Sequence, residues 1–448
     1  MGVLEHAGLL ERVIARLLSG YDSARSQSLA AEAERTLMDF VLCAAAGAEA
    51  SAGWLQIDGD RTATIIGRTE RATPAVAAAR NGCAAHLLDL DDLHWASLSH
   101  PGAYVWPVVL AVGEREGASG AEALRAAIVG YELTIRLARA LGPDHRRFFH
   151  SSTTAGIVGA SLSAALLCGA SVQQAAWACG HAVSVGASLG EHLLERSGTE
   201  HFHRMFAAQT ALLAAHAARR GLDGDLFALE GVRGLLAATA NGGSREVLLE
   251  PLQPWGIEEV SLRYFHTTGW AQAAVEAALA LGEIDVREVE QVVVHVPEVA
   301  IGVAGGAHPK SLEEAWWSIP YAVGVTVAYK DPRRLDDPSL LEDEKVRRLV
   351  QRVQLAALQE TDAHRPATRV IVLRSDGSSL ERTCDAPRGH PAHPFSEEDW
   401  LAKAKAMGLR LRKGAISSLG EVMTSFPDRS VPDWMQELGS WLSSESTR

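Results

Sequence analysis

The sequence predicts a mainly α protein, with a large all-helical domain followed by a smaller α+β domain. Alanine-rich apolar runs fill the chain to about residue 260, and their apolar residues recur at the three- and four-residue spacing of helices. β-Branched runs typical of strands begin only after about residue 285. Since 448 residues exceed what one compact core usually holds, we expect two domains.

The predicted helical domain is a succession of helices joined by short glycine-rich turns. Residues 1–20 have the pattern of an amphipathic helix, and their charges argue against a secretory signal. Longer helices are predicted over 120–142, 153–170 and 207–224, each with a glycine stop signal near its end. Many of their faces carry alanine on all sides, which predicts buried helices that pack closely against each other.

The smaller domain is predicted from strands with helices between them. The run 289–300 is rich in valine, and 369–387 divides into two strands around an Asp-Gly turn. Helical patterns occupy 311–331 and 342–353, between these strands. Strands and helices in this order are typical of an α+β unit.

Helical character returns at the C-terminal end, where Ser396 and the two glutamates that follow it predict a capped helix start. This tail can pack back on the first domain, which would then be discontinuous in sequence. We therefore expect a large helical domain from 1–265, completed by 400–448, and a smaller α+β domain from 266–399.

Composition excludes several classes of function. The net charge is −13 and the chain has no long run of lysine or arginine, so we expect no nucleic-acid partner. No uninterrupted apolar stretch reaches transmembrane length, so we expect no membrane association. The five cysteines are scattered, and an odd number without a CxxC pair predicts a reducing cytoplasm.

The segment from Asp89 to Gly102, DLDDLHWASLSHPG, is the richest cluster of ionisable residues. Its carboxylates repel each other, and apolar helical sequence flanks it on both sides. Ionisable groups between buried helices are where pKa values are adjusted for proton transfer. We therefore expect an acid–base site in this cluster, which consists of Asp89, Asp91, Asp92, His94, Ser97, Ser99 and His100. A solvated acidic loop is the alternative.

Three further segments carry candidate site residues. His150 precedes a run of four hydroxyl residues that predicts a helix start, where anions are favoured, although a plain capped helix explains the same pattern. The second segment, EHFHR, spans 200–204, and the third, RYFHTTGWAQ, spans 263–272. The two histidines of EHFHR are two residues apart, not at the i, i+4 spacing of the zinc motif HExxH, so we expect no metal site.

Two short motifs have weaker interpretations. Residues 186–190 match the GxSxG nucleophile elbow, but the preceding sequence predicts a helix where the elbow needs a strand. The run Leu90-Asp91-Asp92 is similar to acidic magnesium motifs, which usually recruit further carboxylates or a phosphate. No P-loop and no complete GxGxxG occurs.

Several pieces of the chain together resemble the MmgE/PrpD family, which includes 2-methylcitrate dehydratase, cis-aconitate decarboxylase and iminodisuccinate epimerase. The matching pieces, in chain order, are LDLDDLHWASLSHPG, HSSTTAGIVGASLSAALLCG, TEHFHRMFAAQ, RYFHTTGWAQAAVEAAL, SIPYAVGVTVAYKD and RSDGSSLERTCDAPRGHPAHPFSEEDWLAKAKA. Each piece is weak alone, but their order and spacing over nearly the whole chain are specific.

The resemblance implies a helical domain built from both chain ends, an α+β domain, a homodimer, and a site in the cleft between domains. It implies no metal and no organic cofactor. Family chemistry begins by removing a proton next to a carboxylate of a small acid. The intermediate then loses β-hydroxide, is reprotonated on the other face, or forms as CO2 leaves.

The resemblance also implies roles for individual residues. Asp89, His100 and His150 match positions used for substrate binding and proton transfer, Asp92 fits the second carboxylate of the acidic motif, and His203 matches a later family histidine. The predicted catalytic residues are therefore His100, His150, Asp89 and Asp92. The predicted substrate-binding residues are His203, Glu200, His201, Arg204, Arg263, Tyr264, His266 and Gln272.

The chain departs from the family pattern at Leu93, Glu200 and Gln272, where many members carry threonine, lysine and histidine. Replacement of a cation by Glu200 disfavours a tricarboxylate and indicates a substrate with fewer carboxylates or with an amine. Alternatively, Arg204 or His201 takes over the contact with the anion. The 263–272 segment lacks the family's usual Lys-Pro-Tyr-Pro-Cys type of sequence, although its arginine and histidine can replace the charge and the imidazole.

Three functions follow for the chain. The first is a hydro-lyase that dehydrates a β-hydroxy acid, as 2-methylcitrate dehydratase does, with a histidine as base and Asp89 orienting an imidazole. The second is an isomerase, epimerase or decarboxylase acting on a related di- or tricarboxylate. The third is a repurposed or non-catalytic family member, since the family's lysine and histidine are missing.

Overall fold

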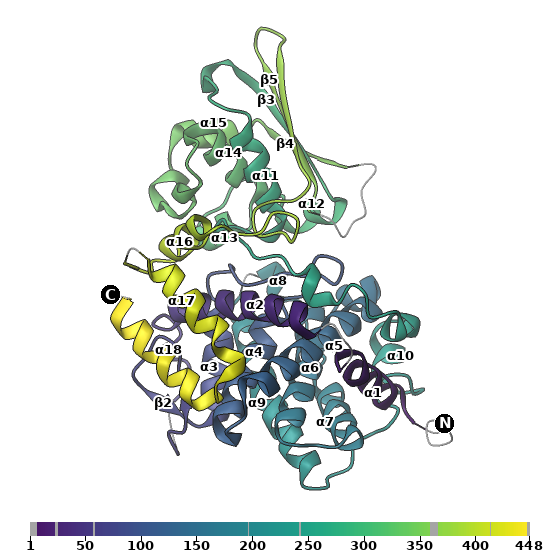
Figure 1. The fold of residues 1–448 in the computed structure, drawn as a ribbon. Helices are drawn as coiled ribbons and strands as arrows, with labels where there is room; N and C mark the ends of the chain where they lie inside the picture. Colours follow the sequence, from purple (N-terminus) through teal and green to yellow (C-terminus); the bar gives the residue numbers. More distant parts are fainter. Residues whose placement is uncertain are drawn as a thin grey trace. The chain divides into compact units, whose positions relative to one another are not determined.

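A computed structural model describes residues 7–22, 26–56, 59–195, 197–241, 243–358, 366–412 and 414–445. The first six residues of the predicted N-terminal helix lie outside this description, and the helix itself begins at Leu9. The chain divides into two compact units (Figure 1). Unit 1 is Met1–Val260 with Gly408–Arg448, and unit 2 is Ser261–Met407.

Unit 1 is helical apart from one short two-stranded ladder. Its helices are α1 (Leu9–Tyr21), α2 (Ser26–Gly47), α3 (Pro74–His86), α4 (Gly102–Glu116), α5 (Gly120–Arg146), α6 (Ser151–Leu167), α7 (Val172–Val185), α8 (His192–Glu195), α9 (Thr199–Arg219), α10 (Leu235–Thr239), α17 (Ala415–Thr424) and α18 (Val431–Glu445), and its ladder is β1 (Ala63–Thr64) with β2 (Arg71–Ala72). Side-chain caps begin several helices. Ser119 and Ser171 form capping boxes at the starts of α5 and α7.

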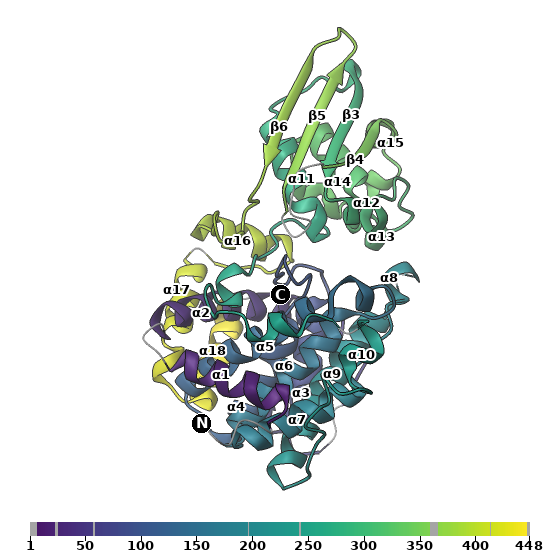
Figure 2. The ribbon, with the colours of Figure 1, turned by 90° about the vertical axis from the view of Figure 1, so that its right-hand side faces the viewer.

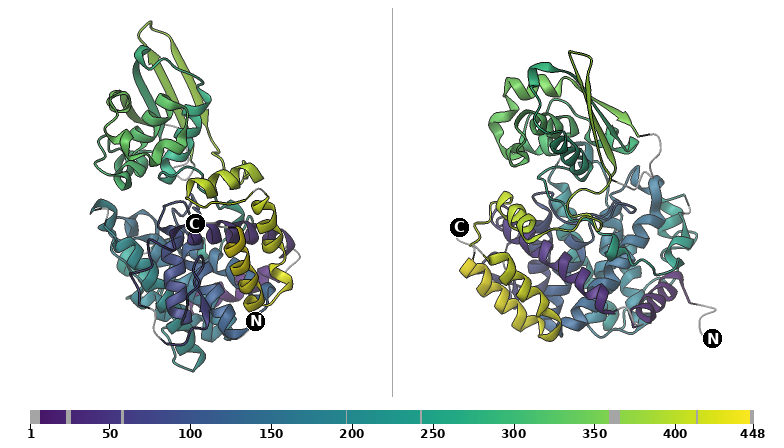
Figure 3. Two further views of the ribbon diagram at one scale, coloured as in Figure 1. Left: turned by 90° about the vertical axis from the view of Figure 1, so that its left-hand side faces the viewer. Right: turned by 45° about the horizontal axis from the view of Figure 1, so that its top comes forward.

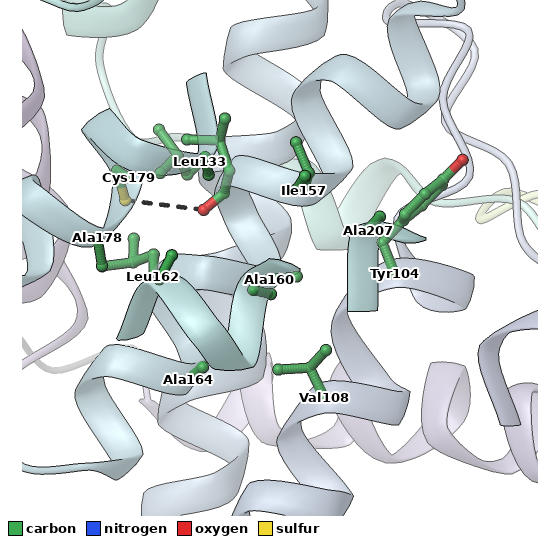
Figure 4. Close-up of a cluster of buried hydrophobic side chains, with 14 of the residues drawn as sticks. Tyr104, Val108, Leu133, Ile157, Ala160, Leu162, Ala164, Ala178, Cys179 and Ala207 are labelled. Atoms are coloured by element: carbon green, nitrogen blue, oxygen red, sulfur yellow. Dashed lines mark hydrogen bonds between the residues drawn. The ribbon is translucent and has the colours of Figure 1, made fainter. Parts of the chain in front are cut away.

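Helix α6 lies in the core of unit 1, packed against α4, α5, α7 and α9. Small residues allow the close approach of α5 and α6, since a Cβ atom added to Gly159 would lie 2.0 Å from Thr134 Oγ1. Figure 4 shows the apolar side chains of this core, where the Cys179 thiol donates to the Val158 carbonyl at 3.7 Å. The predicted buried helices therefore position the start of α6, where His150 lies.

The two ends of the chain meet in unit 1. Helix α17 packs against α2 and α18 packs against α4, and Figure 3 shows α17 and α18 side by side. The Val431 N–H donates to the Ala118 carbonyl at 2.8 Å, which ties the start of α18 to the turn between α4 and α5. The C-terminal segment thus belongs to the same core as the N-terminal helices.

Unit 2 is a four-stranded sheet with helices. Its elements are α11 (Gly269–Ala280), β3 (Val289–Val296), α12 (Glu298–Ala304), α13 (Leu312–Trp316), α14 (Ile319–Tyr329), α15 (Glu344–Val350), β4 (Val353–Ala357), β5 (Thr368–Arg374), β6 (Ser379–Cys384) and α16 (Glu397–Ala406). The strand order is β4-β3-β5-β6, with β3 and β4 parallel and the other pairs antiparallel. Helices α11 and α14 pack against the sheet, behind it in Figure 2.

The predicted fold class, a large helical domain with a smaller α+β domain, is confirmed. Strands β3, β5 and β6 lie where the sequence predicts them, with the turn at Gly377 at a φ of 83°. Strand β4 was not predicted.

Residues 261–265 and 400–407 belong to unit 2, whereas we expected them in the larger domain. The Leu262 N–H donates to Gly389 O, and the ring centroid of Trp400 lies 5.1 Å from that of Phe395, which ties both stretches to unit 2. Among the described residues no helix is both long and apolar enough to cross a bilayer.

Candidate active site

The acid-rich segment predicted from the sequence connects α3 to α4 in unit 1. Asp89, Asp91 and Asp92 are only 7%, 2% and 2% exposed, so the segment is not a solvated acidic loop. Asp89 and Leu98 adopt positive φ angles of 52° and 49°. Such angles are costly for residues other than glycine and are found most often at functional sites.

The carboxylate of Asp92 is an anchor for the start of α4. It accepts hydrogen bonds from the Gly102 N–H at 3.0 and 3.2 Å and from the Tyr131 hydroxyl at 2.9 Å. Burial, together with the charges of Asp91 and Asp39, raises the pKa of Asp92 to about 7. Both oxygens of Asp92 therefore hold neighbouring groups in place, and the catalytic role that we expected for this carboxylate stays a prediction.

His100 is held at both its backbone and its ring. Its N–H donates to Ser152 Oγ at 2.9 Å, near the start of α6, and its Nδ1 lies 2.7 Å from the carbonyl oxygen of Asp92. A carbonyl only accepts, so Nδ1 carries the proton and the lone pair of the neutral ring is on Nε2. His100 therefore has the fixed tautomer that a general base or acid needs.

A charged hub, which we define as His86, Asp91, Glu200 and Arg204, lies beside His100. His86 was not predicted from the sequence. Its Nδ1 donates to Asp91 Oδ1 at 2.7 Å and its Nε2 lies 3.1 Å from Glu200 Oε1. Burial and the Arg204 charge lower the pKa of His86, but Asp91 and Glu200 outweigh them and the pKa lies above its ordinary value. Its ring centroid is 5.3 Å from that of His100.

Glu200 is the centre of the hub. Its Oε1 lies 3.3 Å from Arg204 Nη2 and 3.9 Å from His150 Nε2. Burial raises the pKa of Glu200, but Arg204 and His86 lower it more, so the pKa lies well below its ordinary value. The sequence predicted that Glu200 weakens anion binding. In the structure Arg204 and His86 lie beside the Glu200 carboxylate and balance its negative charge. Part of the positive charge of Arg204 is therefore already used within the protein.

His150 caps the N-terminus of α6. Its N–H donates to Ser188 O at 2.7 Å, and its Nδ1 shares a hydrogen bond of 2.8 Å with Thr153 Oγ1. Burial lowers the pKa of His150 well below its ordinary value, although Glu200 raises it, so this imidazole is neutral near pH 7. In the described part of the chain, the buried hydroxyl of Ser151 in the first turn of α6 has no hydrogen-bond partner.

His150 belongs to a second cluster, the neutral triad, which we define as His150, His192 and His203. Ring centroids lie 4.9 Å apart for His150 and His192, 5.0 Å for His192 and His203, and 6.2 Å for His150 and His203. Burial lowers the pKa of His203 to about 4 and also lowers that of His192. His192 was not predicted from the sequence.

The remaining predicted residue of unit 1, His201, lies beside the hub. Its ring centroid is 5.5 Å from that of Trp54 and 6.3 Å from that of His86. Burial lowers the pKa of His201 to about 4. The structure thus gathers Asp89, His100, His150, Glu200 and their neighbours in one region of unit 1.

Unit 2 carries the other predicted residues, and Gln272 has a structural use there. Its side-chain oxygen accepts from the N–H groups of Tyr264 and Phe265 at 3.0 and 2.9 Å. Its side-chain nitrogen donates to the carbonyls of Phe265 and Thr267 at 2.8 and 3.0 Å. We predicted a substrate contact, but the amide is saturated by backbone groups and fixes the loop before α11.

His266, Tyr264 and Arg263 also lie in unit 2. His266 Nδ1 is 2.6 Å from Asp336 Oδ1, and its ring stacks on Trp316 at 3.9 Å. Tyr264 has the guanidinium of Arg388 over its ring at 4.5 Å, and Arg263 is buried. A cavity of about 350 Å³ is lined by residues that include Tyr264 and His266.

The GxSxG match is not a nucleophile elbow. Helix α7 ends at Val185 and no strand precedes the motif. Ser188 contributes its carbonyl to the His150 N–H. The two unpredicted histidines had weak signals in the sequence: His86 ends an alanine-rich helix, and His192 lies two residues after the GxSxG match.

Comparison with known proteins matches both parts of the chain. Residues 12–247 match the model of the MmgE/PrpD N-terminal domain and residues 265–413 that of the MmgE/PrpD C-terminal domain. Cis-aconitate decarboxylase of Mus musculus is 26% identical over 400 residues, which cover 82% of this chain and 79% of that protein. The human protein of the same name is 26% identical over 398 residues, covering 82% and 80%. A cis-aconitate decarboxylase-like protein of Aspergillus oryzae is 24% identical over 358 residues, covering 73% and 74%. The resemblance inferred from the sequence is confirmed.

Proposed function

The chain belongs to the MmgE/PrpD family, and on that premise we propose that it is a lyase that decarboxylates a small carboxylic acid with proton transfer at carbon. The relatives named cis-aconitate decarboxylases favour loss of CO2 over the dehydration that we expected first. Dehydration and epimerisation, which begin instead with removal of a proton from carbon, are the alternatives.

The observation that carries the proposal is that His100 and His150 are both anchored at the start of α6. His100 donates its N–H to Ser152 Oγ, and His150 is the N-cap of the same helix. A helix N-terminus attracts a carboxylate. Buried polar atoms are almost always hydrogen-bonded, yet within the described residues Ser151 Oγ and Arg204 Nε have no partner. Donors of this kind are suited to an anionic substrate.

The chemistry that we propose moves one proton. The bond to the departing carboxylate breaks, its electron pair stays with the substrate carbon skeleton, and a protonated imidazole supplies the proton that this carbon takes up. His100 Nε2 is the atom that exchanges the proton, because Nδ1 is committed to the Asp92 carbonyl. The raised pKa of His86 keeps positive charge 5.3 Å away, where it stabilises developing negative charge.

The charges of the site favour a mono- or dicarboxylic acid. Arg204 shares its charge with Glu200, and the buried carboxylates Asp89 and Asp91 lie on the same segment as His100. A third substrate carboxylate would therefore lack a compensating cation among these side chains.

The test is incubation of the full-length protein with a panel of small mono-, di- and tricarboxylic acids in D2O, followed by NMR. The proposal expects loss of CO2 with one deuterium incorporated at carbon, and expects turnover to disappear in His100→Gln. The matched control, His216→Gln, changes an exposed histidine of α9. Loss of water from a β-hydroxy acid, or epimerisation without CO2 release, would overturn decarboxylation in favour of an alternative.

A further inference from the structure

Two groups of side chains in the described residues bring three possible metal-ligand atoms within 4.8 Å of one another. One is His86, Asp91 and His100, and the other is the neutral triad. In the first group both nitrogens of His86 are committed to carboxylates, and Nδ1 of His100 is committed to a carbonyl. Three of the four ring nitrogens of that group are therefore already used in hydrogen bonds within the protein.

The neutral triad differs because it has ring nitrogens without partners. His192 Nε2 and His203 Nδ1 are buried and have no hydrogen-bond partner among the described residues. The three residues are 9%, 4% and 9% exposed for His150, His192 and His203. Since buried polar atoms without partners are rare in proteins, these nitrogens point to a ligand.

Two of the three histidines have the outer hydrogen bonds that are typical of metal-binding histidines. His192 donates its Nδ1–H to the Leu189 carbonyl at 3.1 Å, which presents Nε2 to the centre of the triad. Nδ1 of His150 is bonded to Thr153 Oγ1 at 2.8 Å, which leaves Nε2 as its ligand atom. Histidines that bind metals almost always use the other ring nitrogen in this way, which fixes the ring orientation.

We propose that His150, His192 and His203 form a binding site for a divalent transition metal ion, with Zn²⁺ as the best chemical match. Three imidazoles and an open fourth position are a common zinc arrangement, with Zn–N distances of about 2.0–2.1 Å. The three candidate ligand atoms lie within 4.8 Å of one another, close enough to surround a single ion once the rings adjust to it.

Two charges near the triad set its affinity. Glu200 Oε1, 3.9 Å from His150 Nε2, favours a cation, and Arg204, 3.3 Å from the same oxygen, opposes it. The ion would occupy the lone pair of His150 Nε2, next to the Glu200 carboxylate.

The test is a Co²⁺ titration of the untagged full-length protein after treatment with a chelator. We expect one equivalent of Co²⁺ to give the visible absorption of a tetrahedral site, and one equivalent of Zn²⁺ to remove it. His192→Ala and His203→Gln, each checked for folding by circular dichroism, should lose the band. The matched control is His216→Ala, on the same helix as His203, which should keep it.

Absence of the band in the wild-type protein, or its persistence in the folded His192→Ala variant, would overturn the proposal. Binding is measured without substrate, so this result is independent of whether the protein decarboxylates any acid. A protein that binds Co²⁺ but turns over no substrate would retain the metal site and refute the proposed function.

Discussion

The charged hub and the neutral triad are both built on buried histidines of unit 1, but their imidazoles are in opposite electrostatic conditions. His86 lies between the carboxylates Asp91 and Glu200, which hold its pKa above the ordinary value. His203 has other histidines as ring neighbours, and burial lowers its pKa to about 4. Burial alone therefore does not set the protonation state of an imidazole, because the adjacent partners do.

The two clusters therefore differ in the chemistry that their histidines can perform. The hub pairs the cations His86 and Arg204 with the carboxylates Asp91 and Glu200, and this pairing keeps His86 charged inside the protein. The triad supplies unprotonated nitrogens, which suit proton acceptance or metal binding. His150 links the two clusters, since its ring belongs to the triad and its Nε2 lies 3.9 Å from the hub carboxylate Glu200. The following predictions are arranged from the largest expected effect to the smallest.

The strongest challenge to this division is removal of the proton-transfer groups. We expect His100→Gln and His150→Gln each to lower kcat by roughly 10²–10⁴-fold, because glutamine retains polarity but cannot exchange a proton. Steady-state kinetics on the substrate found in the acid panel would measure this, with His216→Gln as control. If either variant kept wild-type kcat, that histidine would have no part in proton transfer.

Breaking the ion pair of the hub should be costly to stability. Arg204 is buried and pairs with Glu200 at 3.3 Å. The substitution Arg204→Met therefore removes one of the cations that balance the charge of the Glu200 carboxylate. We expect the free energy of unfolding to fall by about 3–5 kcal/mol in urea denaturation. The double variant Arg204→Met with Glu200→Gln should recover part of this loss. Equal losses in the single and double variants would show that the pair does not act as a unit.

The two clusters should make opposite contributions to the pH dependence of stability. The pKa of His203 in the folded protein is about 4, below its value of about 6.5 in the unfolded chain. Its contribution to the free energy of unfolding is therefore lost as the pH falls from about 6.5 to 4. The folded pKa of His86 is raised, so its contribution is present below about pH 6.5 and is lost as pH rises through the folded pKa.

Urea denaturation at pH 7.5 and pH 5 would compare His203→Gln and His86→Gln with the wild type. The quantity to compare is the free energy of unfolding of His203→Gln minus that of the wild type. This difference should be about 2 kcal/mol more positive at pH 5 than at pH 7.5, since one pKa unit corresponds to about 1.4 kcal/mol. His86→Gln should show the opposite sign. The same sign for both variants would remove the distinction between hub and triad.

The smallest effect concerns the hydroxyl of Ser151, which has no partner in the described residues. If it contacts the substrate, Ser151→Ala should raise KM about tenfold, which corresponds to about 1.4 kcal/mol, with little change in melting temperature. Ser152→Ala is the contrasting variant, because Ser152 Oγ accepts the His100 N–H and its loss should lower kcat. An unchanged KM in Ser151→Ala would place the substrate elsewhere.

Much of the fold could be predicted from the sequence because its periodicity is local. Alanine-rich helices with glycine stops and the valine-rich run at β3 carry their pattern within a few residues. Strand β4 was missed because it has only five residues, VQLAA, and its first residue, Val353, carried the apolar pattern of the helix predicted over 342–353. Its register depends on pairing with β3, which is distant in sequence.

The site could be predicted only where its residues gather in the sequence. Asp89 and His100 share one polar segment, and His150 stands before a recognisable helix start. His86 was missed because its partner Glu200 is 114 residues away. The use of Gln272 could not be inferred either, since its four hydrogen bonds are to backbone groups whose positions depend on the folded loop.

The charge states of His86 and His150 test the division between hub and triad most directly. Selective ¹⁵N labelling of histidine in the full-length protein would report them at pH 6, with His86→Gln and His150→Gln used to assign the signals. We predict that His86 is predominantly protonated on both ring nitrogens and that His150 carries a proton on one nitrogen only. A neutral His86, or a doubly protonated His150, would contradict the account.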